Sequence, residues 1–409
     1  MRSYFDYAAT SPIRPTALAA YTDELQRIGN PSALHSLGQQ SRLRLEDSRE
    51  ALAEAVGAST PAEVVLTSGG TEADNLAIKG LFWHRNGVPA EGTGTPESIS
   101  QLSHPVIITT PIEHNAVLDT AGWLETQGAQ VLLVDVDADG RISLEHLEEL
   151  LDEHGDRTAL VSIMFANNEI GTVQPVQQAA ALAKAAGVPI HTDAVQAFGQ
   201  LPLNFADLGV DAMTVTAHKI GGPVGIGALI LARDVKAVPV LHGGGQERSL
   251  RSGTLDVAGA AAFAAAAQEA AGSIEHEAPR LSGLRDRLIA GIEANVPNAH
   301  LSGHREDRLP GNVHFTFPGA EADSLLFLLD AAGFATSAGS ACSAGVNRPS
   351  HVLLACGCRE DQARSSQRFT LGHGTTQEEV DKLIEALPGV VEQARKAGMN
   401  SAYDWSQAD

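Results

Sequence analysis

A lone lysine, Lys219, stands in a glycine-rich turn between two apolar runs of the chain, residues 212–216 and 226–231. Runs of this composition predict buried strands. Burial lowers the pKa of a lysine, and its neutral amine is a nucleophile that can form a Schiff base with a carbonyl group. Taken alone, however, Lys219 is better explained as a charged residue at the solvent-exposed tip of a hairpin, so the rest of the chain has to decide.

Polar residues also follow the other predicted strands in the first half of the chain. Because ligands bind outside the carboxyl ends of parallel strands, we expect these residues to meet at one edge of a sheet. In chain order they are Ser68 to Thr71, His114, Asn167 and Asn168, Asp193 and Gln196, and Thr216, His218 and Lys219.

The glycine loop at Gly69 and Gly70 has the arrangement of a phosphate site. It joins a predicted strand, residues 63–67, to the start of a predicted helix. Backbone N–H groups at such a helix N-terminus point toward a bound anion. The same residues are equally typical of a tight strand-to-helix connection.

A lysine, a carboxylate, an anion-binding loop and an aromatic ring partner together fit pyridoxal phosphate. A lysine amine binds the aldehyde of this cofactor, and a carboxylate keeps its ring nitrogen protonated so that the ring withdraws electrons. The groups offered by this chain are Lys219 for the aldehyde, Asp193 for the nitrogen, His114 for the ring face, and Gly70, Thr71, Thr216 and His218 for the phosphate.

The alternation of predicted strands and helices favours an α/β protein with a mostly parallel sheet. A length of 409 residues suits two domains. The net charge is −22, and no run rich in Lys and Arg occurs. These features argue against nucleic acid or an anionic membrane surface as a main partner.

The chain has only three cysteines, Cys342, Cys356 and Cys358, which argues against a disulfide framework and indicates a reducing compartment. No apolar run reaches the length of a membrane span, and the first residues lack the apolar core of a secretory signal. We therefore expect a cytoplasmic protein without membrane contact. Cys356 and Cys358 are interpreted as structural or incidental.

Other segments carry structural expectations. Residues 85–104 are interpreted as a flexible surface insertion with no assigned function. The composition changes near residue 260. Beyond it we expect separate helices over residues 258–271 and 281–294 and a half-exposed strand over residues 311–317.

The segment around Lys219, Ala217-His-Lys-Ile-Gly-Gly-Pro-Val-Gly-Ile-Gly, resembles the cofactor-lysine motif of the class V aminotransferases. More narrowly, the chain resembles the cysteine desulfurases of the NifS/IscS type. Matching segments follow the family order from about residue 4 to residue 372. They are residues 6–12, 30–32, 67–75, 113–117, 167–171, 191–196, 217–219, 242–248, 251–254, 339–343 and 368–372.

The resemblance implies a fold-type I, pyridoxal-phosphate-dependent transferase. A large cofactor-binding domain with a mostly parallel seven-stranded sheet would span residues 15–260. A smaller α+β C-terminal domain, residues 261–409, would carry the cysteine loop, and residues 1–14 would pack with it. Two subunits would form a homodimer with active sites at the subunit interface.

The resemblance also implies a role for individual residues. Cofactor contacts would come from Gly70, Thr71, Thr216 and His218 at the phosphate, Asp193 at the ring nitrogen, Gln196 and Asn168 near the ring hydroxyl, His114 on the ring face, and Lys219 at the aldehyde. Thr254 would reach the phosphate in the other subunit. The substrate would meet Asn30, Asn168 and Arg368, because a guanidinium group suits a carboxylate. The catalytic residues would be Lys219 as the base, His114 as a proton carrier, and Cys342.

Cys342 decides which reaction the resemblance implies. It lies in the small-residue run 336–345, which predicts a mobile loop, against the alternative of a small core residue. Its thiolate would attack the sulfur of L-cysteine, keep that sulfur as a persulfide and release L-alanine. An acceptor protein of iron–sulfur cluster assembly or tRNA thiolation would then take the sulfur. No resident metal is implied, and Cys342 would at most be a transient iron–sulfur ligand shared with a scaffold protein.

Alternatives and departures from the family pattern stay open at this point. A selenocysteine lyase, or another class V enzyme, would use the same cofactor residues. A sulfur-carrying assembly scaffold without turnover is a further alternative, against which the intact Lys219, Asp193 and Cys342 argue. Residues 85–104 look inserted, and His373 stands where the family often has arginine. These departures leave the chemistry intact and the acceptor undefined.

Overall fold

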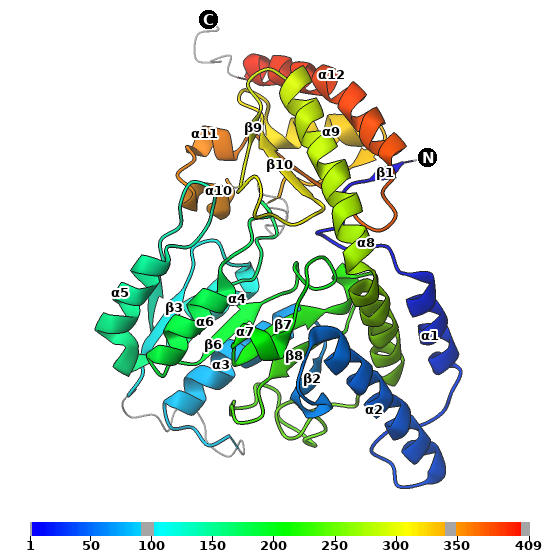
Figure 1. Cartoon of the computed structure of the whole chain (residues 1–409), viewed down its shortest axis with the longest axis vertical. Helices are drawn as coiled ribbons and strands as arrows, with labels where there is room; N and C mark the ends of the chain where they lie inside the picture. The colour runs from blue at the N-terminus through cyan, green and yellow to red at the C-terminus, as the bar shows by residue number, and fades with distance from the viewer. Residues whose placement is uncertain (1, 91–101, 340–348, 402–409) are drawn as a thin grey trace, which may run out of the picture.

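The computed structural model describes residues 2–90, 102–339 and 349–401. The described chain forms two layered parts, one above the other in Figure 1, and the long helix α8 (Val257–Asn295) runs through both. A seven-stranded sheet organises the lower part, and a three-stranded sheet the upper part.

The elements of the lower part come from the first two thirds of the chain. In chain order they are α1 (Pro15–Leu25), α2 (Ser36–Val56), η1 (Pro61–Glu63), β2 (Val64–Thr67), α3 (Gly70–Arg85), β3 (Val106–Thr109), α4 (Asn115–Glu125), β4 (Gln130–Leu133), α5 (Leu144–His154), η3 (Gly155–Arg157), β5 (Thr158–Ser162), α6 (Val176–Ala185), β6 (Ile190–Asp193), α7 (Phe205–Leu208), β7 (Ala212–Thr216), η4 (Ala217–Lys219) and β8 (Gly227–Leu231).

The elements of the upper part follow α8, apart from the N-terminal strand. They are β1 (Ser3–Tyr4), β9 (His300–Leu301), β10 (Asn312–Thr316), α9 (Ala322–Ala331), β11 (Phe334–Ala335), α10 (His351–Ala355), α11 (Glu360–Ala363), β12 (Ser366–Thr370) and α12 (Gln377–Ser401).

The large sheet has the strand order β2-β8-β7-β6-β5-β3-β4. Every neighbouring pair is parallel except the two that β8 makes with β2 and β7. The predicted α/β fold with a mostly parallel seven-stranded sheet is therefore confirmed. Its strands are apolar on both sides because helices cover both faces. Leu76 and Phe82 of α3 pack on one face, and Leu52 of α2 and Phe263 of α8 belong to the core on the other.

Helix α8 is continuous, so the prediction of separate helices over residues 258–271 and 281–294 is wrong. Pro279 lies inside the helix and removes one intrahelical hydrogen bond. The helix continues because both halves are held by packing. Phe263 belongs to the core of the large sheet, and Leu288 belongs to the core of the upper part.

Strand β10 is buried along its whole length, so the prediction of a half-exposed strand is also wrong. Val313 and Phe315 pack in the upper core. The intervening polar side chains are covered as well. Asn312 Nδ2 donates to the carbonyl of Glu169 at 3.1 Å, and His314 lies opposite Arg368 of β12.

The N-terminal segment joins the upper part. Strand β1 pairs in parallel with β11, and Phe5 packs in the upper core. The predicted domain boundary at residue 260 falls inside α8, and the division into domains stays a prediction.

Residues 91–101 of the predicted insertion lie outside the described residues. The described ends of the insertion are joined by Asn86. Its Nδ2 donates to the carbonyl of His104, and its Oδ1 accepts from the amide of His104.

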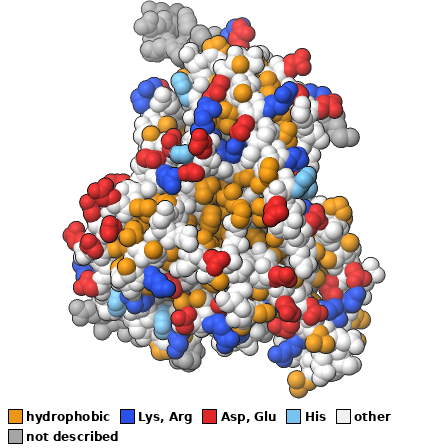
Figure 2. Space-filling view, viewed as in Figure 1, with side chains coloured by type: hydrophobic (Ala, Val, Ile, Leu, Met, Phe, Trp, Pro, Cys, Tyr) orange, Lys and Arg blue, Asp and Glu red, His pale blue; other side chains and the backbone are white. Residues whose placement is uncertain are grey.

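The surface carries the acidity of the chain as dispersed charge, with a local concentration on α5, at the left of Figure 2. Glu148, Glu149, Asp152 and Glu153 are all exposed there. Among the helices of the described ranges, none combines the length and the apolar stretch that a membrane crossing requires.

Candidate active site

A pocket of about 380 Å³ lies at the carboxyl edge of the large sheet, a size that suits a small-molecule ligand. Residues that follow β2, β3, β5, β6 and β7 line it, so the structure brings together most of the polar residues that follow those strands, while Ser68 and Asn167 do not line the pocket. The lining residues are Ala8, Ala9, Gly70, Thr71, Asp74, His114, Met164, Ala166, Asn168, Asp193, Val195, Gln196, Thr216, His218, Lys219, Gly339 and Arg368.

Lys219 lies in the turn between β7 and β8, which pair as an antiparallel hairpin. Its side chain is partly buried and lines the pocket. The Nζ group donates to the carbonyl of Ala8 at 2.5 Å and to the carbonyl of Ala9 at 2.9 Å. Lys219 is thus at a hairpin turn, but the N-terminal segment holds its amine inside the pocket, away from a solvent-exposed tip.

Asp193 is the last residue of β6 and is buried. Its Oδ1 accepts from the amide of Val195 at 2.9 Å. Burial raises the pKa of Asp193, and His114 and Lys219 act in the opposite direction. Gln196, in the same turn, donates from Nε2 to the carbonyl of Ala8 at 3.1 Å. A buried carboxylate of this kind gains most from a cationic ligand group.

His114 caps the N-terminus of α4 and lines the pocket. Its Nδ1 accepts from the amide of Ala116 at 3.2 Å, so the proton of the neutral ring lies on Nε2. The preceding Glu113 is buried, and its Oε1 accepts from the Thr110 hydroxyl and from the amide of Met164. Burial raises the pKa of Glu113 to about 8.

The N-terminus of α3 lies at the pocket, and glycines stand at two close approaches beside it. A Cβ on Gly70 would lie 3.1 Å from Cγ2 of Val195, and a Cβ on Gly227 would lie 2.8 Å from the backbone of Gly69. Burial lowers the pKa of His218 to about 4, so its ring is neutral at pH 7. Helix N–H groups beside the hydroxyls of Thr71 and Thr216 suit an anion such as phosphate.

Arg368 of β12 reaches the pocket from the upper part of the molecule and is buried. Its Nη1 donates to the carbonyl of Asn168 at 2.8 Å, and its Nη2 donates to Asp6 Oδ1 at 2.9 Å. Within the described ranges, Arg368 Nε and both ring nitrogens of His314 have no hydrogen-bond partner. The guanidinium is therefore oriented by protein oxygens and keeps unused donor capacity.

Two predicted site residues of the described chain, Asn30 and Thr254, do not line this pocket, and a third, Cys342, lies outside the described residues. Asn30 is exposed, and its Oδ1 accepts from the amide of Ser32 in a local turn. Thr254 is exposed as well. Cys342 and most of its predicted mobile loop lie outside the described residues. The described residue Gly339, three positions before Cys342 in the sequence, does line the pocket.

Sequence reasoning missed some pocket residues. The carbonyl groups of Ala8 and Ala9 hold Lys219, and no side-chain pattern indicates a backbone acceptor. Asp74 is buried in the pocket wall. Its signal is an acidic residue among the apolar residues Ala73, Leu76 and Ala77 of α3.

Cys356 and Cys358 lie apart from the pocket. Cys356 packs with Ile170 and Leu353, and burial together with Cys358 raises the pKa of its thiol to about 12. Across residues 2–90, 102–339 and 349–401, no group of three or more His, Cys, Asp or Glu side chains is arranged to hold a metal ion.

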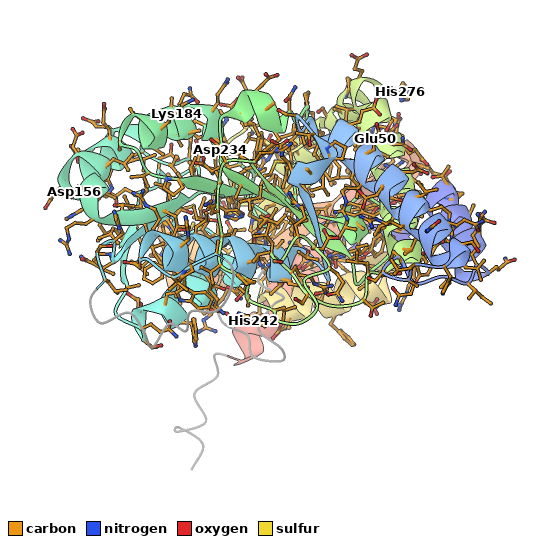
Figure 3. The ribbon with its side chains drawn as sticks, turned by 90° about the horizontal axis from the view of Figure 1, so that it is seen from below. Glu50, Asp156, Lys184, Asp234, His242 and His276 are labelled. Carbon is orange, nitrogen blue, oxygen red and sulfur yellow. The ribbon has the colours of Figure 1, made fainter. Side chains whose placement is uncertain are left out.

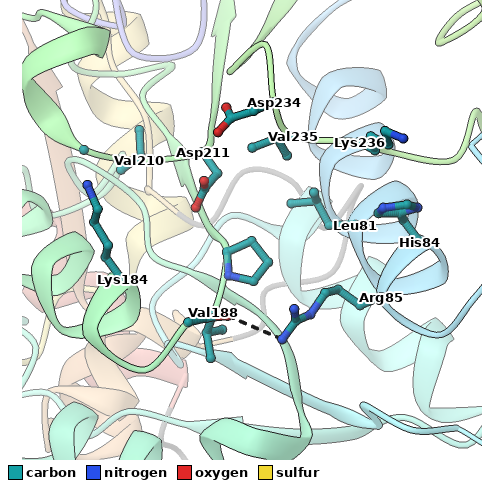
Figure 4. Close-up of a pocket in the computed structure, with 13 residues that line it drawn as sticks. Leu81, His84, Arg85, Lys184, Val188, Val210, Asp211, Asp234, Val235 and Lys236 are labelled. Atoms are coloured by element: carbon teal, nitrogen blue, oxygen red, sulfur yellow. Dashed lines mark hydrogen bonds between the residues drawn. The ribbon is translucent and has the colours of Figure 1, made fainter.

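A second pocket, of about 540 Å³, lies at the opposite edge of the sheet, against the residues that precede β6 and β7. Lys184 and Asp234, which line it, are both exposed and are labelled in Figure 3, the view from below. In the close-up of Figure 4, Arg85 reaches the carbonyl of Gly187, and this contact is long at 3.4 Å. None of the predicted site residues lines this pocket.

The comparisons with known proteins agree with this geometry. The family model described as aminotransferase class V matches residues 3–383. An IscS-like cysteine desulfurase of Mycobacterium tuberculosis is 48% identical over 402 residues, which cover 98% of this chain and 99% of the relative. A cysteine desulfurase IscS of Dictyoglomus turgidum is 39% identical over 393 residues, 96% of this chain and 95% of that protein.

Solved structures give the same answer. A NifS-like protein matches with a TM-score of 0.85 at 34% identity, over 96% of this chain and 100% of that one. A NifS-like protein from Rickettsia africae matches with a TM-score of 0.83 at 29% identity and the same coverage. The fold is that of the NifS-like structures, and the chain belongs to the class V aminotransferase family. Within the family it belongs with the cysteine desulfurases of the NifS/IscS type.

Proposed function

We propose that the chain is a pyridoxal-phosphate-dependent cysteine desulfurase, which releases L-alanine from L-cysteine and keeps the sulfur as a persulfide on Cys342. The observation that carries this proposal is one pocket that gathers the amine of Lys219, the buried carboxylate of Asp193 and an open helix N-terminus. The relatives named cysteine desulfurase support the choice of reaction.

The residues present fit the cofactor. Asp193 is a buried carboxylate of the pocket lining whose Oδ1 accepts from a backbone amide, and such a carboxylate suits a protonated ring nitrogen. Gly70 lies close to the Val195 side chain and Gly227 lies close to the backbone of Gly69, so glycine at both positions fits the close packing around the N-terminus of α3. The Lys219 amine contacts the uncharged carbonyl groups of Ala8 and Ala9 at the pocket.

Bound pyridoxal phosphate supplies an aldehyde that condenses with an amine and a ring that withdraws electrons from the substrate's α-carbon. Lys219 would hold the aldehyde, Asp193 the ring nitrogen, and Gln196 the ring hydroxyl. Asn168 would lie near that hydroxyl and near the substrate. His114 would cover the ring face.

The phosphate would be held by Gly70, Thr71, Thr216 and His218. Because the His218 ring is neutral at pH 7, it would act there as a hydrogen-bond donor rather than as a cation. Thr254, exposed in the single chain, would reach the phosphate of a second copy in a homodimer.

Arg368 would bind the carboxylate of the substrate, helped by Asn30. Its guanidinium is already oriented by Asn168 and Asp6, so it is prepared for a planar partner. A lysine at this position would keep the positive charge but could not form the two parallel hydrogen bonds that a guanidinium group makes to a carboxylate.

Lys219 would remove the α-proton of the substrate, and His114 would carry a proton on Nε2, the nitrogen that its cap hydrogen bond leaves protonated. The Cys342 thiolate would attack the substrate sulfur. The carbon–sulfur bond breaks, the sulfur stays on Cys342, and the carbon skeleton takes up protons and leaves as alanine. A protein of iron–sulfur assembly or tRNA thiolation would accept the sulfur, in the cytoplasm.

The test is an assay of purified protein with pyridoxal phosphate, L-cysteine and a thiol. We expect a yellow protein that releases alanine and sulfide in equal amounts. A yellow protein that forms no alanine would contradict the desulfurase assignment. A parallel assay with selenocysteine tests the lyase alternative, which a strong preference for selenium would favour.

Cys342→Ala should keep the yellow colour and lose sulfide release, because the sulfur acceptor is removed. Cys358→Ala is the matched control, since it removes a partly buried thiol away from the pocket. Equal sulfide release by wild type and Cys342→Ala would remove Cys342 from the reaction.

A further inference from the structure

A second carboxylate, Asp74 of α3, lines the same pocket as Asp193. Its side chain is 2% exposed, and its Oδ1 has no hydrogen-bond partner among the described residues. A buried carboxylate oxygen without a donor is costly if it is charged, so its position in the wall of a ligand pocket calls for an explanation.

Asp74 lies at the end of a buried polar track made of Ser162, His191, Thr214 and Asp74. The Ser162 hydroxyl is 2.9 Å from Nδ1 of His191, and Nε2 of His191 is 3.0 Å from the Thr214 hydroxyl. The same Nε2 lies 3.6 Å from Asp74 Oδ1. Thr214 is the direct neighbour of Asp193 in the register of β6 and β7, so the track passes beside Asp193.

The polar track contains no cation that could pair with a charged Asp74. Burial lowers the pKa of His191 to about 3, so its ring is neutral. The charged groups that act on Asp74 from neighbouring elements, Asp193 of β6 and Glu113 of the loop after β3, are acidic, and the Thr214 side chain of β7 acts in the opposite direction by lowering the pKa of Asp74. His114 and Lys219 lower the pKa of Asp193 and so favour its charged form.

Two carboxylates in one buried site do not both ionise, because each disfavours the charge of the other. Burial first, and then Asp193, raise the pKa of Asp74 well above its ordinary value. Asp193 is the better place for the single charge, since it accepts an amide hydrogen bond and lies within the influence of His114 and Lys219.

We propose that Asp74 is a positioning residue: it keeps its proton, so that the pair carries one negative charge, placed on Asp193 where the ring nitrogen of the cofactor binds. This inference rests on the proposed function, since it concerns how Asp193 is prepared for that ring. Asp74 then matters as a neutral, buried carboxyl group in the pocket wall, and its own charge is not used.

Cofactor binding separates these roles. Stripped protein would be titrated with pyridoxal phosphate for the wild type, Asp74→Asn, Asp74→Ala and Asp193→Asn. We expect Asp74→Asn to bind within about twofold of the wild type, and Asp74→Ala about tenfold more weakly because the buried side chain no longer fills the pocket wall. Asp193→Asn should weaken binding by about a hundredfold or more, since the ring loses its carboxylate. If Asp74→Asn weakens binding as much as Asp193→Asn, the charge of Asp74 is used and the inference is wrong.

The absorbance of the bound cofactor gives a readout that a purely structural role would not move. As the pH rises, the wild type should show a step in the absorbance when Asp74 loses its proton beside Asp193. Asp74→Asn should lack this step. The same step in both proteins would contradict the inference.

The pH dependence of unfolding of the cofactor-free protein tests whether Asp74 is protonated in the folded state. A carboxyl group whose pKa is higher in the folded state than in the unfolded state stabilises the fold at low pH and loses this contribution as the pH rises. The free energy of unfolding of Asp74→Asn should therefore rise relative to that of the wild type above about pH 4. Asp211→Asn is the matched control, because burial raises the pKa of Asp211 at the opposite edge of the sheet. It should show the same trend in unfolding and no change in cofactor binding.

The results also separate this inference from the proposed function. A wild-type protein that binds no pyridoxal phosphate would overturn the proposed function and this inference with it. A wild type that binds the cofactor, with an Asp74→Asn variant that behaves like Asp193→Asn, would overturn the inference alone.

Discussion

The two pockets at opposite edges of the large sheet contain similar side chains that are held differently. Each has lysine and aspartate in its lining, and the pocket at the amino edge is the larger, about 540 Å³ against about 380 Å³. At the carboxyl edge, Lys219 donates to two carbonyls and Asp193 accepts from an amide, both within the pocket. At the amino edge, Lys184 and Asp234 are exposed, and Asp211 is the exception, since its Oδ2 accepts from a backbone amide and burial raises its pKa.

The difference shows that cavity volume is a poor guide to chemistry. Exposed charges keep their hydration and behave as they do in water, whereas desolvated groups fixed by backbone partners acquire shifted pKa values and a set geometry. The direction of the strands decides which edge is which, because the loops that follow parallel strands all leave on one side.

The largest difference between the pockets is expected for their lysines. Lys219→Ala should lower the rate of alanine formation from cysteine by about 10²–10⁴-fold, because the base and the cofactor anchor are lost together. Lys184→Ala, the matched change at the other edge, should leave the rate unchanged. Equal rates for all three proteins would remove the distinction between the pockets.

The next largest difference is expected for the arginines of the two pockets, measured as the KM for cysteine. Arg368→Ala should raise the KM for cysteine by about 10–100-fold, the worth of a charge-assisted hydrogen bond to a carboxylate. Arg368→Lys should fall in between, since it keeps the charge without the fork. Arg85→Ala, at the amino edge, should not change KM. A change in kcat alone for Arg368→Ala would assign it a role other than substrate binding.

A smaller effect should distinguish buried histidines behind the carboxyl-edge pocket from surface histidines. Burial lowers the pKa of His314 to about 3, so the folded protein stays neutral there while the unfolded chain takes up protons below its ordinary pKa of 6.5. Stability is then lost as the pH falls, by up to about 1.4 kcal/mol per pH unit for such a group.

His314→Gln should therefore show a shallower loss of unfolding free energy between about pH 6 and about pH 4, measured by denaturant titration. His276→Gln is the control, because that side chain is 82% exposed and labelled at the surface in Figure 3. A slope for His314→Gln equal to that of the wild type would show that His314 is not the group that titrates.

The smallest effect is expected at the amino-edge pocket itself. Asp234→Asn removes an exposed carboxylate and should change the free energy of unfolding by no more than about 0.5 kcal/mol, with unchanged cofactor binding. Thermal and denaturant unfolding would measure it. A loss of several kcal/mol or of cofactor would show that the amino-edge pocket is a functional site.

Much of the carboxyl-edge pocket could be predicted because strand ends are readable in the sequence. An apolar run followed by a polar residue fixes both the strand and its carboxyl end, which is why His114, Asp193 and Lys219 were placed together correctly. Contacts made by backbone atoms could not be predicted in this way. The carbonyls of Ala8 and Ala9 are an example, since any residue offers a carbonyl.

The errors in the fold have a common cause. In both cases tertiary packing overrode the local sequence signal. Helix α8 continues past Pro279 because its two halves pack in two cores, and in β10 the loop that carries Glu169 covers the side that the alternating sequence predicts to be exposed. Asp74 escaped notice for a related reason. An acid on a helix is usually solvated, and only the assembled pocket shows that this one is buried.

The most direct test of the central claim is to locate the lysine that holds the cofactor. Borohydride reduction of the purified yellow protein locks pyridoxal phosphate onto that lysine, and peptide mapping by mass spectrometry then identifies it. We predict that the modified peptide contains Lys219. Modification of Lys184 or Lys236 instead would place the chemistry at the opposite edge of the sheet and contradict the account.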